Sequence, residues 1–429
     1  MRRRSVLIVP TLFSLFAAAC SDTLTPDRSR ATAISPATAA NHDESEGRGV
    51  FNRYVAIGTS LSMGWQSDGV IAATQETSWP AQLAAMAHRS ITQPYIQYPG
   101  CRSPLAAPLG TFTRLSGEPA GQDPATLSCA PLQDDVVKPV ENLAINAALT
   151  KDALLTTPEN TTDLSNAKLI SRVLQPGMTQ VSSMVAQNPK LVSVEFGGNE
   201  VLNARTGVAI EGVTMFPYAA WVPLYDAVLD QVQQAAKEAV VVGLIDDVRS
   251  FPSFHAGEEI WLNRQAFAAF NVNVDVDCHD SPNVVFLPLF VPTALGTGAF
   301  YASHQFGPYT LHCSSPDPTK EDFILTPAEV SSVNNLMARM DDHIQQEAAR
   351  RGFAYFRLQA LYGRPDIKVP FNLPAFLQSQ SPYGPLVSLD GVHPTGAGAK
   401  ILAEAAAQAL DDRYNHHILA SASALIANQ

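Results

Sequence analysis

The sequence predicts an α/β protein whose parallel sheet is covered by helices on both faces. Short apolar runs typical of buried strands alternate along the chain with longer segments of helical spacing. Two of these runs end directly in glycines, as strands do where they enter a sharp turn. The strand-like runs are 54–57, 140–145, 191–196, 239–245 and 353–358. The helical segments are 79–88, 176–187, 218–237, 327–350 and 396–414.

The strand-like runs are short and rich in β-branched and other apolar residues, a composition that favours strands buried in a sheet. The clearest helix start is Thr326 followed by Pro327, a capping residue before a first-turn proline. Four intervening segments are rich in loop-forming residues and long for an economical α/β domain. We expect them to form a substrate-facing cap rather than a second core. They lie near 98–138, 203–217, 247–322 and 363–388.

The first twenty residues have the pattern of an export signal. A basic start and a short apolar run are followed by small residues directly before Cys20. Small residues before a cysteine resemble a bacterial lipoprotein cleavage site, which makes Cys20 the expected lipidated residue. The alternative is ordinary signal cleavage nearby, with Cys20 unmodified. Residues 21–50 lack periodic apolar spacing and are expected to be a flexible linker, followed by a folded domain over 51–414 and a C-terminal tail over 415–429.

The composition argues against a nucleic-acid partner. Of the 429 residues, 46% are hydrophobic and only 16% are charged, and the net charge is −12. Binding to nucleic acid requires clustered Lys and Arg side chains, which this balance does not favour. We therefore expect no nucleic-acid partner. The protein is also expected to be a monomer that binds a small-molecule or polymeric ligand and reaches a membrane only through an N-terminal lipid.

Four cysteines remain when Cys20 is set aside, an even number in a chain predicted to leave the cytoplasm. Two disulfides are therefore expected. Three connectivities are possible. We favour the pairs that are adjacent in sequence, Cys101 with Cys129 and Cys278 with Cys313, because each closes a loop of moderate length.

A metal site is the competing interpretation for one of these cysteines. Ligand-type side chains surround Cys278, but no second Cys-x-x-Cys or His-x-x-x-His group accompanies them. We therefore predict no metal. The cluster consists of Asp275, Asp277, Cys278, His279 and Asp280.

Three short stretches carry residues suited to acyl-transfer chemistry. Gly58-Thr59-Ser60-Leu61 follows the first strand-like run, so Ser60 is either a turn residue or an exposed nucleophile. Gly197-Gly198-Asn199-Glu200 follows the third run and delivers Asn199 to the carboxyl edge of the sheet, where ligands bind in open parallel sheets. There the Asn199 amide either caps a turn or donates a hydrogen bond to a developing oxyanion.

The third stretch, 388–398, contains Asp390-Gly-Val-His393-Pro394 directly before the last helical segment. In a glycine-containing turn this spacing lets the carboxylate reach one imidazole nitrogen while the other faces a nucleophile. The alternative is a turn at a helix start, in which Asp390 is a cap and His393 lies on the surface.

Taken together, the three stretches resemble the SGNH, or GDSL-type, esterases and lipases over residues 51–414. The family's Gly-Asp-Ser-Leu block corresponds to residues 58–61, its Gly-x-Asn-Asp block to residues 197–200, and its Asp-x-x-His-Pro block to residues 390–394. The resemblance implies a three-layer α/β/α fold with a flavodoxin-like parallel sheet of about five strands and insertions near 98–138 and 247–322. It also implies Ser60 as nucleophile, His393 as base and Asp390 as its partner.

The sequence departs from the family pattern at three places. Thr59 and Glu200 each replace an aspartate, although neither position makes or breaks bonds in the family. The second block normally supplies a glycine whose N–H joins the oxyanion hole with the Ser60 N–H and the Asn199 amide. The best match, 142–148, has Ala147 there, which requires a negative φ to be unstrained. The other candidate is Gly100.

The function implied by the resemblance is hydrolysis of carboxylic esters through an acyl-enzyme, without a cofactor. Lipid esters, acetylated sugars and polyesters all fit it. An inactive surface lipoprotein that binds a glycan or polymer on a hydrolase scaffold is the alternative. The chain lacks the Gly-x-Ser-x-Gly of other α/β-hydrolases, and its one Ser-x-x-Lys has no Lys-Thr-Gly partner. Several aromatic residues are candidates for lining an acyl groove: Trp65, Trp221, Phe300, Tyr301, Tyr309 and Tyr383.

Overall fold

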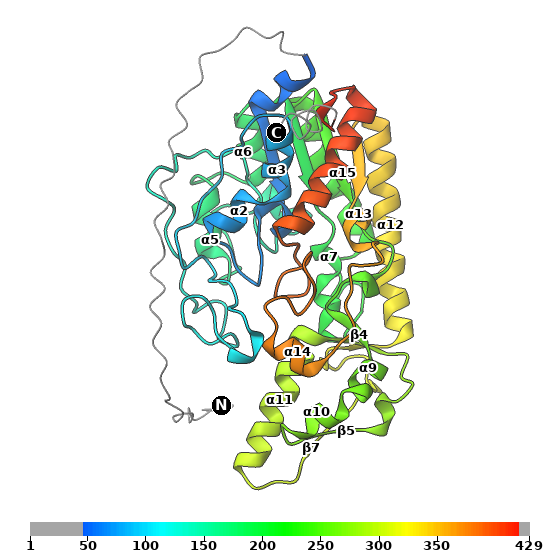
Figure 1. Ribbon diagram of the computed structural model, residues 1–429. Coiled ribbons are helices and arrows are strands. Elements are labelled where there is room, and N and C mark those ends of the chain that lie inside the picture. Colours follow the sequence, from blue (N-terminus) through cyan, green and yellow to red (C-terminus); the bar gives the residue numbers. More distant parts are fainter. Residues whose placement is uncertain (1–45, 420–429) are drawn as a thin grey trace, which may run out of the picture. The chain divides into compact units, whose positions relative to one another are not determined.

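The centre of the protein is a parallel sheet with the strand order β1-β2-β3-β9 (Figure 1). The computed structural model describes residues 46–419, and all of these residues belong to one compact unit. Almost every residue of the four strands is buried, as expected for a parallel sheet covered on both faces. The strands are β1 (Tyr54–Gly58), β2 (Leu191–Glu195), β3 (Glu238–Gly243) and β9 (Ala354–Arg357).

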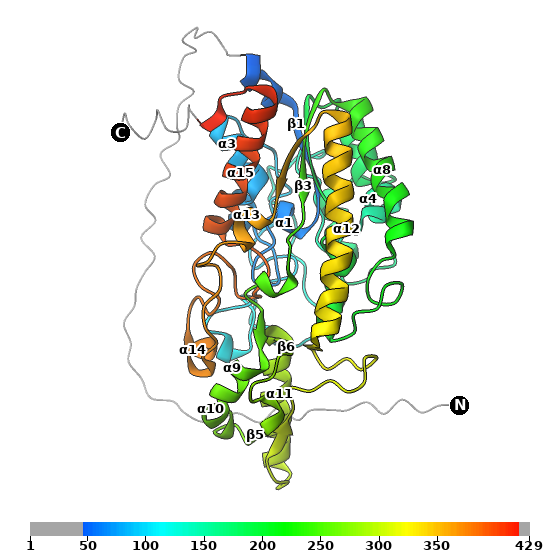
Figure 2. The same cartoon turned by 90° about the vertical axis from the view of Figure 1, so that its right-hand side faces the viewer.

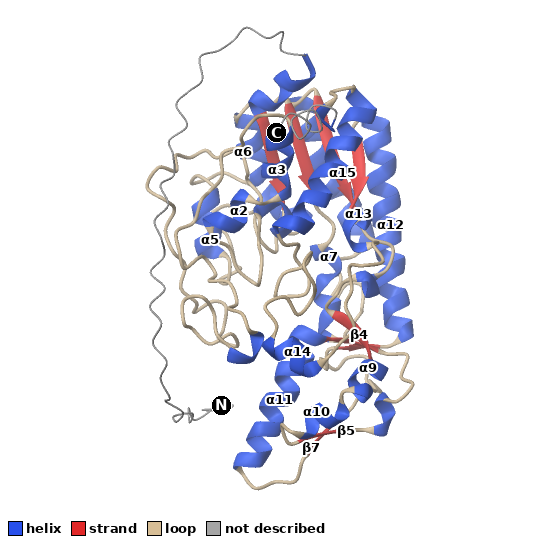
Figure 3. Cartoon of the chain, in the orientation of Figure 1, coloured by secondary structure: helices blue, strands red, loops and turns tan. Residues whose placement is uncertain are grey.

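The carboxyl ends of the four strands meet at one edge of the sheet (Figure 3). Gly58 is paired with Glu195, and Gly243 is paired with Arg357. This edge is the place where open parallel sheets bind ligands. The residues that follow β1 and β2 are therefore brought together by the strand register alone.

The predicted strand at 140–145 forms only a single bridge to the sheet. Asn142 pairs in parallel with Ala56, and the Leu143 N–H donates to the Ala56 carbonyl at 2.8 Å. The Ile145 N–H donates to the Gly58 carbonyl at 3.1 Å. The segment thus runs alongside β1 as a partial fifth strand, and it ends at the same edge.

Helices cover the two faces of the sheet, as predicted (Figure 2). On one face lie α3 (Trp79–Met86) and α15 (Gly396–Tyr414). On the other lie α6 (Gln180–Ala186), α8 (Tyr218–Ala235) and α12 (Pro327–Arg351). The indoles of Trp79 and Trp221 are fully buried. The architecture is therefore the expected three-layer α/β/α arrangement.

The described residues also form several short helices outside the main layers. The α-helices are α1 (Ser60–Met63), α2 (Ala72–Glu76), α4 (Thr150–Leu155), α5 (Ala167–Val173), α7 (Asn199–Leu202), α13 (Gln359–Tyr362) and α14 (Leu373–Gln378). The 3-10 helices are η1 (Glu46–Arg53), η2 (Leu109–Thr111), η3 (Asn203–Thr206), η4 (Val248–Ser250) and η5 (Val276–Cys278). Residues 46–50, the end of the predicted linker, thus lie within η1.

The segment 247–322 contains far more regular structure than the loops that the sequence predicts. Two small sheets, β4-β6-β8 and β5-β7, form from this segment and the short strand that follows it, beyond the carboxyl edge of the main sheet (Figure 1). Their strands are β4 (Phe254–Ala256), β5 (Val272–Val274), β6 (Val284–Phe286), β7 (Tyr309–Leu311) and β8 (Ile324–Leu325). The helices of this lobe are α9 (Gly257–Leu262), α10 (Arg264–Ala268) and α11 (Leu287–Ser303).

The prediction of loops in this segment was wrong mainly because α11 contains residues that disfavour helices. Pro292, Gly296 and Gly298 all lie inside it. Gly298 is required by packing, because a Cβ there would lie 2.4 Å from the Phe270 carbonyl oxygen. Tertiary contacts therefore override the local preference that the sequence displays.

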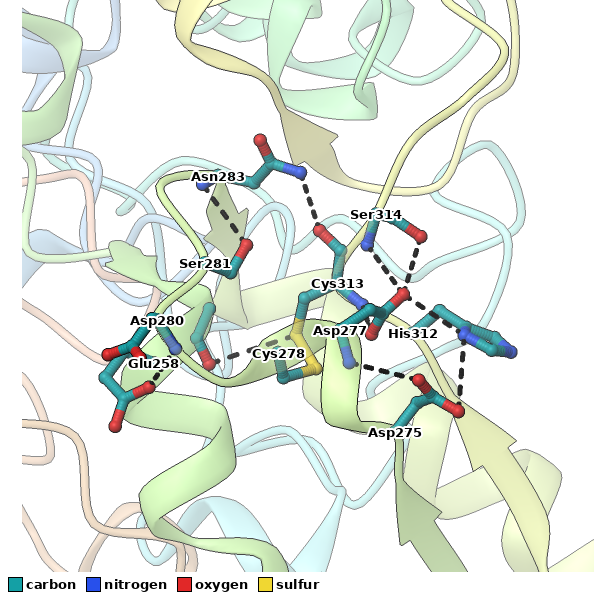
Figure 4. The surroundings of a disulfide bond; sticks show 11 residues. Glu258, Asp275, Asp277, Cys278, Asp280, Ser281, Asn283, His312, Cys313 and Ser314 are labelled. Carbon is teal, nitrogen blue, oxygen red and sulfur yellow. Dashed lines mark hydrogen bonds and ion pairs between the residues drawn. A yellow bond between two sulfur atoms is a disulfide. The ribbon is translucent and has the colours of Figure 1, made fainter.

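Both predicted disulfides are present, Cys101–Cys129 and Cys278–Cys313. The first cross-links two parts of the loop-rich segment 98–138. The second joins η5 to the chain just after β7 (Figure 4). Because disulfides persist in oxidising compartments, the two bonds are consistent with an exported protein. Within residues 46–419, no helix is both long and apolar enough to cross a membrane.

The first residues of the predicted C-terminal tail pack against the domain. His416 is 4% exposed, and its Nε2 lies 2.5 Å from a carboxylate oxygen of Glu238 at the start of β3. The folded part therefore extends past residue 414. The last ten residues of the predicted tail lie outside the described residues.

Candidate active site

Ser60 stands at the turn between β1 and α1, at the carboxyl edge of the sheet. The strand ends at Gly58, where a Cβ would lie 2.9 Å from the Glu195 carbonyl oxygen, and α1 begins at Ser60 itself. Ser60 is 4% exposed, and its Oγ lies 2.8 Å from Nε2 of His393. The sequence thus places a hydroxyl at a tight turn, and the fold directs it to an imidazole 333 residues away.

Asp390 and His393 lie in one turn directly before α15. His393 Nδ1 is 2.9 Å from Asp390 Oδ2, which is the contact predicted from their spacing. The second carboxylate oxygen accepts the backbone N–H groups of Val392 and His393, each at 2.9 Å. Backbone N–H groups of the turn therefore hold the carboxylate in place, and the carboxylate in turn orients the imidazole.

The Asp390 carboxylate is buried yet remains ionised. Burial alone raises its pKa, but the neighbouring His393, its hydrogen bonds and the Asp68 N–H outweigh this and lower the pKa to about 2. The Asp68 N–H donates to Oδ2 at 2.8 Å, and the Asp68 side chain is itself held by Arg102 and Arg114, each at 2.6 Å. A charged carboxylate at this position orients the His393 ring.

A second buried carboxylate, Glu195, lies behind the nucleophile. It ends β2 and accepts hydrogen bonds from the Thr59 N–H at 3.0 Å and the Thr59 hydroxyl at 2.8 Å. The Ser62 hydroxyl donates to it at 3.1 Å. Burial raises the pKa of Glu195 to about 7, although these hydrogen bonds oppose the shift. Residues on both sides of Ser60 are thus tied to one side chain.

Asn199 begins α7, and its amide Nδ2 donates to the Ala148 carbonyl at 2.9 Å. An amide nitrogen carries two hydrogens, so one remains for another acceptor. The adjacent Glu200 accepts the Thr150 N–H at 2.7 Å and the Thr150 hydroxyl at 2.6 Å. Glu200, which stands where the family has aspartate, therefore helps to hold the segment that contains Ala147 against α7.

Ala147 has a φ of +59°, so the negative φ that would leave alanine unstrained at this position is not found. The backbone keeps the left-handed conformation for which glycine is the ordinary residue. No described residue accepts a hydrogen bond from the Ala147 N–H or the Ser60 N–H. The N–H of the other candidate, Gly100, donates a hydrogen bond to the Gln97 carbonyl at 3.0 Å. Ala147 lines a second pocket beside α4, and its role in an oxyanion hole stays a prediction.

An apolar pocket opens beside Ser60, His393 and Asn199. Its walls come from the ends of the sheet strands and from the 247–322 lobe, which therefore faces the site. They include Ile245, Val248, Phe251, Phe254 and Phe286. None of the six aromatic residues proposed from the sequence lines it, and three of them are buried elsewhere in the core: Trp65, Trp221 and Tyr383.

Three site residues were missed at the sequence level: Glu195, Asp68 and Arg205, which lines the apolar pocket. A carboxylate at the end of an apolar strand-like run, next to two glycines, is a usable signal for Glu195. Asp68 and Arg205 lie in loop or 3-10 segments without any periodic pattern. Their positions depend on long-range contacts that a single sequence does not display.

Asp277, one of the ligand-type residues around Cys278, is engaged in several hydrogen bonds (Figure 4). Asp277 accepts the Cys313 N–H at 3.0 Å and the Ser314 hydroxyl at 2.6 Å, and it lies 3.2 Å from His312 Nδ1. It thus fastens the strand end that carries Cys313. The predicted lipidation residue, Cys20, lies outside the described residues.

The fold and this arrangement define a class of α/β hydrolytic proteins with a serine, a histidine and a carboxylate at the sheet edge. Residues 54–406 match the family model described as GDSL-like lipase/acylhydrolase. The chain therefore belongs to this family, and it is a carboxylic ester hydrolase.

Comparison with solved structures finds distant likenesses. A variant of an acetyl xylan esterase from Geobacillus stearothermophilus is 12% identical, with a TM-score of 0.33, over 83% of this chain and 93% of that one. An extracellular lipase from Streptomyces rimosus is 16% identical, with a TM-score of 0.29, over 82% of this chain and 98% of that one. A comparison with curated protein sequences finds no match.

Proposed function

We propose that the protein is a serine esterase that works through an acyl-enzyme, with Ser60, His393 and Asp390 as its triad. The observation that carries this proposal is an unbroken line of hydrogen bonds. Ser60 Oγ lies 2.8 Å from His393 Nε2, and His393 Nδ1 lies 2.9 Å from Asp390 Oδ2. These distances suit proton transfer from a nucleophile to an oriented base.

In the first step, Ser60 Oγ attacks the ester carbonyl carbon while His393 Nε2 accepts the hydroxyl proton. Collapse of the tetrahedral intermediate breaks the carbon–oxygen bond to the alcohol, which takes that proton from His393. In the second step, water attacks the acyl-Ser60 ester with His393 again as base. The acid is released and the Ser60 hydroxyl is restored, while Asp390 stabilises the imidazolium in both steps.

The oxyanion would be held by the N–H groups of Ser60 and Ala147 and by the Asn199 amide. Two features support this set: both backbone N–H groups lack an acceptor among the described residues, and Asn199 lines the pocket of Ser60. Such donors typically contribute several kcal/mol in the transition state, about 3 kcal/mol for one side-chain amide.

The substrate is proposed to be an ester with a hydrocarbon group next to the scissile bond. Lipid, acetylated-sugar and polyester substrates all remain compatible with the chemical step. The pocket walls of aliphatic and phenyl side chains favour a substrate with more than an acetyl group, because burial of apolar area is worth roughly 25 cal/mol per Å².

Steady-state hydrolysis of p-nitrophenyl esters of increasing chain length, with acetyl-xylan alongside, tests this function. We expect turnover that rises from acetate to longer esters and is abolished in Ser60→Ala. A matched control is Ser331→Ala, at an exposed serine of α12. If Ser60→Ala kept more than a few per cent of wild-type turnover, Ser60 would not be the nucleophile.

We also propose that the mature protein is tethered to a membrane by lipid on Cys20, with an outer membrane or the cell surface as its location. The basic start, the short apolar run and the three alanines before Cys20 support this. Cys20→Ser should release the protein from the membrane fraction or leave its signal uncleaved. Wild-type protein found only in the membrane-free fraction would contradict the proposed lipid tether.

A further inference from the structure

The apolar pocket beside Ser60 contains one guanidinium group. Besides aliphatic and phenyl side chains, three titratable residues among those described line this pocket: Glu195, His393 and Arg205. Glu195 and His393 have the hydrogen bonds given above. Arg205 comes from η3, the 3-10 helix that directly follows α7 and Asn199. It therefore extends the same chain segment that supplies the proposed oxyanion amide.

Arg205 has no partner of its own. Its side chain forms no hydrogen bond, ion pair or aromatic contact with any residue in the described range 46–419. The neighbouring arginines differ, since Arg102 and Arg114 are both ion-paired with Asp68 at 2.6 Å. Arg205 is half-buried among mainly apolar walls, so the hydrogen bonds of its guanidinium group are left to water or to a bound ligand.

The carboxylates nearest to Arg205 are already engaged by other groups. Burial lowers its pKa, while Asp68 raises it, Arg102 lowers it and Asp390 raises it, so these three charges are its electrostatic neighbours. Both carboxylates are already engaged, Asp68 by two arginines and Asp390 by His393 and backbone N–H groups. Three guanidinium groups thus face two carboxylates. Glu195 adds at most one negative charge from behind Ser60, where Thr59 and Ser62 donate to it.

We propose that Arg205 binds a carboxylate group of the substrate, so that the preferred substrates are esters that also carry a free carboxylate. This inference rests on the proposed esterase function and names its substrate class. The planar guanidinium can hold a carboxylate through two parallel hydrogen bonds. The apolar walls would cover the hydrocarbon between the carboxylate and the scissile ester.

Matched pairs of chromogenic esters test the proposal in the full-length protein. On the acyl side, the p-nitrophenyl half-ester of glutaric acid is compared with p-nitrophenyl pentanoate. On the alcohol side, 3-butyryloxy-4-nitrobenzoate is compared with o-nitrophenyl butyrate. We expect kcat/KM to favour the anionic member of at least one pair, and the pair concerned identifies the side on which the carboxylate lies.

Arg205→Met should reduce kcat/KM for the favoured anionic ester by about 10- to 100-fold, the range expected for hydrogen bonds to a charged group. Activity on the neutral ester should stay within about threefold of wild type. Arg205→Lys should recover part of the loss because it restores the charge. The control is Arg350→Met, an exposed arginine of α12 that is ion-paired with Glu347 near the opposite end of the sheet. In that variant, the ratio of kcat/KM for the anionic ester to kcat/KM for the neutral ester should equal the wild-type ratio in both pairs.

Three outcomes would overturn the proposal. In the first, the wild type does not prefer the anionic member of either pair. In the second, Arg205→Met lowers the rates on both members equally, which would make Arg205 a residue that only shapes the site. In the third, Arg205→Met loses the preference but unfolds at a clearly lower temperature, and Arg205→Lys restores stability without the preference. Failure of the proposed function looks different, because the wild type would then hydrolyse none of the four esters.

Discussion

Thr59 and Glu195 form a buried pair behind Ser60, with the Thr59 hydroxyl 2.8 Å from both carboxylate oxygens and the Thr59 N–H 3.0 Å from one of them. The first block of the family has an aspartate where this chain has Thr59. Here the carboxylate comes instead from the end of the neighbouring strand β2. The register that pairs Gly58 with Glu195 makes this exchange possible.

Glu195 should make stability depend on pH near neutrality. Its folded-state pKa of about 7 exceeds the ordinary value of 4.5, so the folded state holds this proton more tightly than the unfolded state. Its contribution is therefore fully present below about pH 4.5 and is lost as pH rises toward 7, by about 3 kcal/mol in total. Urea unfolding from pH 4.5 to 8 should show this fall in wild type and a flatter profile in Glu195→Gln.

The matched control for that experiment is Glu76→Gln, at an exposed glutamate of α2. Its profile should run parallel to that of the wild type. Parallel profiles for wild type and Glu195→Gln would mean that Glu195 does not titrate in this range.

Asn199→Ala should lower kcat by about 100- to 1000-fold while leaving KM within a few-fold. The amide would stabilise the oxyanion, which exists only in the transition state and intermediate, so its loss falls on the chemical step. Asn203→Ala, at an exposed residue four positions along the same segment, is the control and should retain activity. An equal loss in the two variants would indicate a general disturbance of the segment.

Each disulfide should contribute about 3–4 kcal/mol to the free energy of unfolding, because the bonded cysteines are 28 and 35 residues apart. Urea unfolding of the double variants Cys101→Ser/Cys129→Ser and Cys278→Ser/Cys313→Ser measures the two contributions. The two double variants should differ in activity, with the larger loss in Cys101→Ser/Cys129→Ser. Cys101 precedes Arg102, which holds Asp68 near Asp390, whereas Cys278 lies in the lobe. A larger loss of activity in the second variant would contradict this assignment.

The sheet, its major helices and the cysteine pairs could be predicted because each leaves a local trace. Continuous apolar runs mark strands such as Leu191–Glu195, and Thr326-Pro327 marks the start of α12. An even cysteine count beside an export-signal pattern predicts two disulfides, and the moderate loop lengths favour the pairs that are adjacent in sequence. The motif around Ser60 directly follows a strand, and the motif around His393 directly precedes a helix. Both positions can be recognised from the sequence.

The remaining features depend on contacts between distant segments. Helix α11 was missed because Pro292 and two glycines mask it, and Gly298 is explained only by its contact with Phe270. The left-handed φ of Ala147 follows from the course of the chain between Ile145 and Thr150, not from residue type. The unpartnered state of Arg205 is likewise a property of the assembled site.

Covalent labelling with a fluorophosphonate probe tests the central claim most directly, because the probe reacts with a serine only when that serine is activated as a nucleophile. We expect one labelled peptide in the wild type, with the modification mapped to Ser60 by mass spectrometry, and none in Ser60→Ala. Labelling should also be lost in His393→Ala, which keeps the hydroxyl but removes its base. A folded wild-type protein that is not labelled, or is labelled at another serine, would contradict the account and favour a binding protein on a hydrolase scaffold.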